Sequence, residues 1–175
     1  METLNRVYLA LVPFILCSCA TSSITVEQIS AQVERQGAKS YLMETFDNHE
    51  QWFAHTKALQ QGLDNGDDAA LNVVSKIKAV SDAGASVSLN FMVARAIPKN
   101  SNIVSSSVKS GFELSGICNV PYIEEEQEVV DEYIKNAQAS LKKEMELGDV
   151  MAGECLEILE SRITSASKMT PGGAF

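Results

Sequence analysis

The residues that could carry metal chemistry in this chain do not have the spacing of a known metal site. His49 and Glu50 begin like the HExxH zinc motif, but Phe53 stands where the second histidine ligand is needed. The only other histidine, His55, follows six residues after His49, and a helix would direct the two rings to different faces. The sequence therefore predicts no metal site, and nothing in it indicates a cofactor.

Candidate nucleophiles are equally unspecific. The SxxK pattern of penicillin-binding enzymes begins at Ser106, at Ser140 and at Ser165. The companion KTG and SDN motifs are missing, and three matches in one small chain are typical of chance. No serine or cysteine stands with a histidine and an acid in a recognisable triad order. These residues favour a binding protein over an enzyme.

Two acidic clusters have structural explanations. The turn at residues 64–68 resembles a calcium loop, but Ser75 occupies the place of the closing glutamate. A second cluster stands at the predicted start of a long helix, where the macrodipole favours negative charge. If the chain has a partner-binding surface, we expect it at this second cluster, formed by Glu124, Glu125, Glu126 and Glu128.

The overall charge limits the possible partners. The chain has a formal net charge of −9. An acidic protein repels phosphate backbones, so nucleic-acid binding is not expected. There is no basic amphipathic stretch for binding anionic lipids. A cationic protein is the partner class that this charge fits.

The N-terminal segment has the pattern of an export signal. Arg6 precedes an apolar run at residues 7–16, which is too short for a permanent membrane span of about 20 residues. The run ends in Leu16-Cys17-Ser18-Cys19, which resembles the lipobox of bacterial lipoproteins. The resemblance implies a signal at residues 1–18 and lipidation of Cys19. With Ala20 next, it implies an anchor on the periplasmic face of the outer membrane. The alternative is cleavage after Ala20, which would give a soluble periplasmic or secreted protein.

The four cysteines then divide into two groups. Cys17 leaves with the signal, and Cys19 is lipidated or lost. Cys118 and Cys155 remain, and an even pair in an oxidising compartment is expected to form a disulfide. Such a bridge would stabilise the fold by about 3–4 kcal/mol in the chain-entropy model. The alternative is that the two are unrelated buried thiols.

The mature part of the chain reads as helical throughout. Residues 19–25 form a short tether, residues 26–165 a single compact all-α domain, and residues 166–175 a flexible tail. Apolar residues recur at helical spacing, with no period-two strand pattern. We expect six to seven short helices at residues 26–46 (broken or kinked at Gly37), 49–63, 69–81, 85–97, 101–112, 123–145 and 149–163.

Several finer expectations accompany this fold. Residues 85–97 should form a central, largely covered helix, and Trp52 and Phe53 should lie in the core. Residues 111–121 should be a loop that holds Cys118 near the surface of the core. A Leu-Asn pair at residue 71 recurs at residue 89 and hints at stacked helical pairs, although two copies do not establish a repeat.

The sequence thus predicts an exported helical domain that acts by binding a cationic protein, for example a toxin or a wall-degrading enzyme. The alternatives are a cell-envelope enzyme with an unrecognised site and a structural envelope spacer.

Overall fold

The computed structural model describes residues 24–123 and 125–169, with side-chain positions up to residue 165. The predicted signal, Cys17, Cys19, Glu124 and the end of the predicted tail lie outside the described residues. Within the described ranges the chain is helical and contains no strand. The prediction of an all-α fold is therefore confirmed.

The described part of the chain forms nine helices, two or three more than predicted. They are α1 (Val26–Gln36), α2 (Ala38–Phe46), α3 (His49–Asp64), α4 (Asp68–Lys78), α5 (Ala83–Ala96), α6 (Ile103–Lys109), α7 (Leu114–Ile117), α8 (Gln127–Glu146) and α9 (Val150–Met169). Gly37, with a φ of 83°, separates α1 from α2. A single helical turn, α7, replaces part of the expected loop. The last helix, α9, continues past Ile163, where the sequence predicted its end.

Short polar side chains at the turns determine where most of these helices begin. Thr25 and Gln28 form a reciprocal capping box at the start of α1. At other helix starts a side-chain oxygen accepts a hydrogen bond from a backbone N–H of the first turn, which would otherwise lack a partner. These caps are Asn48, Asp67, Asp82 and Asp149.

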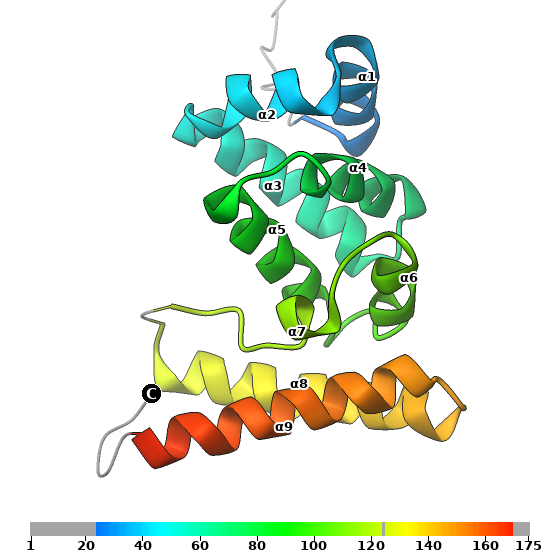
Figure 1. Ribbon diagram of the computed structural model, residues 1–175, viewed down its shortest axis with the longest axis vertical. Coiled ribbons are helices and arrows are strands. Elements are labelled where there is room, and N and C mark those ends of the chain that lie inside the picture. Colours follow the sequence, from blue (N-terminus) through cyan, green and yellow to red (C-terminus); the bar gives the residue numbers. More distant parts are fainter. Residues whose placement is uncertain (1–23, 124, 170–175) are drawn as a thin grey trace, which may run out of the picture.

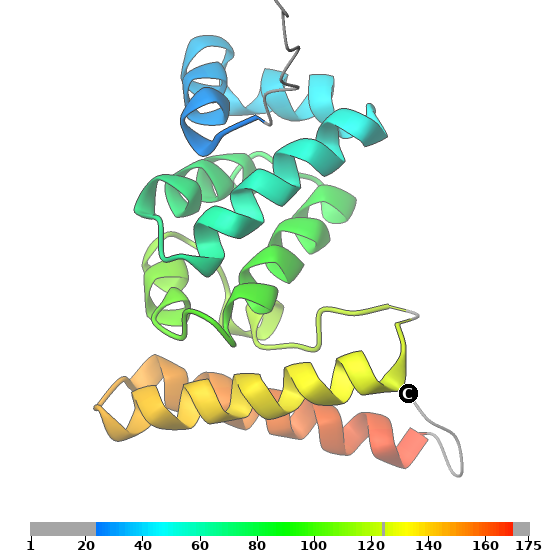
Figure 2. The same cartoon turned by 180° about the vertical axis from the view of Figure 1, so that it is seen from behind.

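The helices are arranged in two parts (Figure 1). Helices α1–α7 form a layered body, and α8 and α9 form an antiparallel hairpin that lies across one end of it. Figure 2 shows the same arrangement from behind. One continuous hydrophobic core joins both parts, with Leu59, Ile77 and Leu89 in the body and Leu141 and Leu159 in the hairpin. The prediction of a single compact domain agrees with this continuous core.

Helix α5 is central, as predicted, because it packs against α3, α4, α6 and α7. Leu89, Met92 and Val93 are buried, although Val87 on the same helix is 47% exposed. The two Leu-Asn pairs do not occupy equivalent positions. Asn72 is exposed, whereas the side chain of Asn90 lies against Gly116 of α7.

The buried face of α3 differs from the predicted one. Phe53, expected in the core, is 69% exposed. Trp52 is half-buried and packs edge-to-face against Phe46, with ring centroids 5.2 Å apart. The interior positions are taken by His55, Leu59 and Leu63. The prediction for Phe53 was wrong because the inward face of α3 carries His55 and Leu59, and Phe53, two residues before His55, lies on the opposite side of the helix.

Candidate functional site

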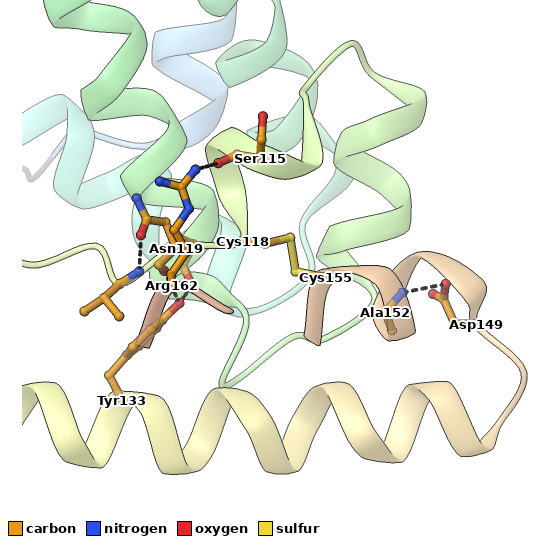
Figure 3. Close-up of a disulfide and its surroundings, with 10 residues drawn as sticks. Ser115, Cys118, Asn119, Tyr133, Asp149, Ala152, Cys155 and Arg162 are labelled. Carbon is orange, nitrogen blue, oxygen red and sulfur yellow. Dashed lines mark hydrogen bonds between the residues drawn. A yellow bond between two sulfur atoms is a disulfide. The ribbon is translucent and has the colours of Figure 1, made fainter. Parts of the chain in front are cut away.

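The disulfide is the first predicted site that the structure tests. Cys118, directly after α7, is bonded to Cys155 of α9, and their Cα atoms are 5.2 Å apart (Figure 3). The predicted pairing is therefore confirmed. Cys118 is 1% exposed and Cys155 is fully buried, so Cys118 lies deeper than the expected surface loop would place it. Because neither sulfur is accessible, the bridge has the character of a structural link between the body and the hairpin.

Polar contacts support the same junction. The hydroxyl of Tyr133 on α8 is 3.1 Å from the Ala94 carbonyl oxygen and 3.0 Å from that of Asn119, and it donates to these acceptors. Ser140 of α8 donates to the Pro98 carbonyl oxygen at 3.0 Å. The hairpin is thus attached to the body along much of its length, and its position relative to α5 is well defined.

The acidic cluster lies at the start of α8, but this helix begins four residues later than predicted, at Gln127 instead of Ile123. Glu126 is the residue before the first helical turn, and its side chain makes no capping hydrogen bond. Ile123, expected to face inward, is 70% exposed. Only Glu128 lies in the first turn, so the helix dipole accounts for fewer of these charges than the sequence suggested.

The structure brings the acidic side chains to one solvent-exposed region. Glu125, Glu126 and Glu128 are exposed, and Asp131 on the next turn is exposed as well. We call these four residues the acidic surface. Glu124 lies outside the described residues. Exposed Ile123 adjoins this surface and adds an apolar side chain to its edge.

A cleft of about 290 Å³ lies between the body and α8. Its charged and aromatic lining includes Asp64 of α3, Arg95 of α5, Lys99 after α5, Tyr122 of the connecting loop and Glu132 of α8. Nothing in the sequence pattern indicated this cleft, because its residues come from four separate segments.

No match was found for this chain among protein-family models, curated proteins or solved structures. Its function must therefore be argued from its own residues. In the part of the chain that the structure describes, no helix is both long enough and apolar enough to cross a membrane.

Of the other sequence motifs, the turn at residues 64–68 contributes Asp64 to the cleft, and Ser140 contacts the backbone of Pro98, which also lines it. His49 is exposed at the start of α3, whereas His55 is buried. Among the described residues, no three histidine, cysteine or acidic side chains come together as a metal site. The Ser140 hydroxyl of one SxxK segment donates its proton to the Pro98 carbonyl oxygen, so this proton is not shared with a catalytic base.

One buried polar pair was missed by the sequence analysis. The Tyr41 hydroxyl lies 2.6 Å from Nδ1 of His55, and the two rings stack with centroids 5.7 Å apart. Burial lowers the pKa of His55 and raises the pKa of Tyr41, because both charged forms would lose hydration. Both side chains are therefore neutral, and the histidine tautomer determines which of the two donates this hydrogen bond. The available signal was the spacing of His55, Leu59 and Gly62 along one face of α3.

Proposed function

We propose that this protein is an exported binding module that captures a cationic protein, such as a toxin or a wall-degrading enzyme. We further propose that it is anchored through Cys19 on the periplasmic face of the outer membrane. The observation that carries the binding proposal is the acidic surface, where four carboxylates are exposed together beside an exposed isoleucine.

The electrostatics of the chain support a cationic partner. The acidic surface adds a local concentration of negative charge to a chain whose net charge is −9. Such a surface attracts a basic protein over about 10 Å at moderate ionic strength and speeds its association. The exposed side chain of Ile123 adds apolar surface near the carboxylates. Protein interfaces contain such apolar surface in addition to charged groups.

The disulfide and the N-terminal residues support export. A buried disulfide is typical of proteins that fold in an oxidising compartment. The segment Leu16-Cys17-Ser18-Cys19 resembles a lipobox, and the described domain starts only a few residues after it. Cleavage after Ala20, which would release a soluble periplasmic or secreted protein, remains the alternative localisation. A cell-envelope enzyme and a structural spacer remain the alternative functions.

Charge reversal tests the binding proposal. The double variant Glu125→Lys/Glu128→Lys should slow association with a cationic lysozyme, used as a probe, by roughly tenfold at low salt, because charges at the rim of an interface act mainly on the association rate. The matched control is Glu154→Lys/Glu157→Lys, which makes the same charge change at exposed positions of α9. Surface plasmon resonance at two salt concentrations measures the association rates of both double variants.

The control separates a local effect from the effect of net charge. Equal slowing in both variants would show that only net charge matters and would remove the acidic surface as a binding site. If neither this probe nor any basic protein from an envelope fraction binds the wild type, the binding module is refuted. The enzyme and spacer alternatives would then remain.

A second experiment tests the anchor. Cys19→Ala should abolish labelling of the protein by a fatty-acid analogue in a bacterial host and release it from the membrane fraction, because Cys19 is the proposed lipidation site. Cys17→Ala is the matched control and should remain labelled. Processing after Ala20 without any label in the wild type would favour the soluble alternative.

A further inference from the structure

The cleft between α5 and α8 differs in charge from the rest of the molecule. Two carboxylates, Asp64 and Glu132, and two cations, Arg95 and Lys99, line it, so its charged lining is neutral on a strongly acidic chain. Lys99 forms an ion pair with Asp64. Arg95 and Glu132 have no ion-pair partner within 4.0 Å among the residues that the structure places, although they line the same cleft. Within the described ranges, the cleft thus presents one cation and one anion that form no ion pair.

The guanidinium of Arg95 is held in place from two sides. Its Nη2 donates a hydrogen bond to the Pro121 carbonyl oxygen at 2.9 Å, and its Cζ lies 5.4 Å from the ring centroid of Tyr122. Tyr122 in turn packs edge-to-face against Tyr133, whose hydroxyl is anchored to the backbone of two other segments. The hydrogen bond to Pro121 uses only one of the five N–H groups, and a fixed guanidinium can bind a carboxylate with two N–H groups at little cost in side-chain entropy.

We propose that this cleft binds a small zwitterion, namely a free amino acid or an unblocked dipeptide. Arg95 binds the ligand carboxylate, Glu132 binds its ammonium group, and the partly exposed Val129 contacts its apolar part. The volume of about 290 Å³ lies at the small end of ligand sites, which suits a ligand of this size. A cationic peptide side chain fits less well, because Arg95 and Lys99 would repel it.

The test measures amide shifts of isotope-labelled full-length mature protein during titration with a panel of free amino acids and unblocked dipeptides. Each ligand is paired with its N-acetyl form, which lacks the ammonium group, and its amide form, which lacks the carboxylate. We expect at least one unblocked ligand to shift amides at residues 95–99 and 129–136. Both blocked forms should bind roughly tenfold more weakly or worse, because each loses a charged hydrogen bond. Comparing amino acids with dipeptides distinguishes the two ligand sizes.

Two variants assign the charged contacts. Arg95→Gln should abolish binding of the unblocked ligand, and Arg95→Lys should restore it only in part, because lysine lacks the planar fork. Glu132→Gln should remove the preference for the unblocked over the N-acetyl form. Because Glu132 is exposed and its side chain makes no hydrogen bond or ion pair with any residue of the described ranges, this variant should fold normally. Arg35→Gln and Glu157→Gln, at exposed positions outside the cleft, are the matched controls.

Three results would overturn the proposal. They are no amide shift with any member of the panel, equal binding by Arg95→Gln and wild type, and equal binding of the N-acetyl and unblocked forms, which would indicate a simple anion site. This inference is independent of the proposed function. The two proposals have separate measurements, because the acidic surface is tested by association with a basic protein and the cleft by titration with zwitterions.

Discussion

At the scale of single residues, the buried Tyr41–His55 pair is the polar contact with the clearest energetic consequence. His55 is 4% exposed and Tyr41 fully buried, so Nδ1 of His55 depends on the Tyr41 hydroxyl for its hydrogen bond. The imidazole is held neutral because burial lowers its pKa below the ordinary value of 6.5. The unfolded chain has no such restriction, and its histidine takes up a proton near that value.

This difference predicts an acid-sensitive stability. As the pH falls below about 6.5, the unfolded state binds a proton that the folded state resists, so the free energy of unfolding should decrease. The slope contributed by His55 is at most about 1.4 kcal/mol per pH unit. His55→Gln should remove this contribution, and His49→Gln, at an exposed position of the same helix, should keep it. Urea unfolding of the three proteins between neutral and mildly acidic pH measures the slopes, and equal slopes in all three would contradict the prediction.

At the scale of elements, helix packing in the body depends on a close approach at Gly62. A Cβ atom added there would lie 2.6 Å from Cβ of Ala70 on α4 and 3.2 Å from Cγ2 of Val26 on α1. Real carbon atoms do not approach so closely, so α4 would have to move. Gly153 of α9 makes a useful comparison, because its nearest neighbour is Cγ of the flexible Met145 at 3.3 Å.

The two glycines should therefore respond differently to the same substitution. Replacing glycine by alanine inside a helix gains about 1 kcal/mol in helix propensity. At Gly62 we expect overpacking to exceed this gain, so that Gly62→Ala destabilises the protein by about 1–2 kcal/mol. Gly153→Ala should be neutral or stabilising by up to about 1 kcal/mol, because Met145 can turn aside. Urea unfolding monitored by far-UV circular dichroism compares the stabilities of the two variants. If Gly62→Ala is as stable as Gly153→Ala, α3 and α4 lie further apart at Gly62 than the structure places them.

At the scale of the whole molecule, the disulfide joins the two parts of the fold. It closes a loop with a sequence separation of 37 that contains all of α8. The hairpin also shares the continuous hydrophobic core with the body and is joined to it by polar contacts from α8 and α9. In the unfolded chain the bridge therefore keeps residues 118 and 155 together and limits how far the segments that form the hairpin and the body can separate.

Removing the bridge should cost about 3–4 kcal/mol of unfolding free energy in the chain-entropy model. The variant Cys118→Ala/Cys155→Ala should show this loss in urea unfolding monitored by circular dichroism. Wild type unfolded and refolded in the presence of a reductant serves as the control and should approach the same stability, because it keeps the side chains and loses only the bond. A loss below about 1 kcal/mol would mean that the reduced unfolded chain is already restricted.

The sequence by itself determined the local features of this protein. The spacing of apolar residues predicted most helices, because an amphipathic pattern depends on residues only a few positions apart. The count of cysteines left after the expected export predicted the Cys118–Cys155 pair. Glycine at position 37 marked the division of α1 from α2 for the same local reason.

Only the tertiary structure decided which polar residues lie inside and which charges meet. His55 is buried because Tyr41, on another helix, provides its hydrogen-bond partner, and that contact turned Phe53 outward. Helix α8 begins at Gln127 in the structure. The loop before it is held at Pro121, whose carbonyl oxygen accepts a hydrogen bond from Arg95 of α5. Arg95 and Glu132 meet in one cleft although they lie far apart in the chain. Periodicity carries no information about such contacts, because their free energy depends on partners that only the packing of distant elements brings together.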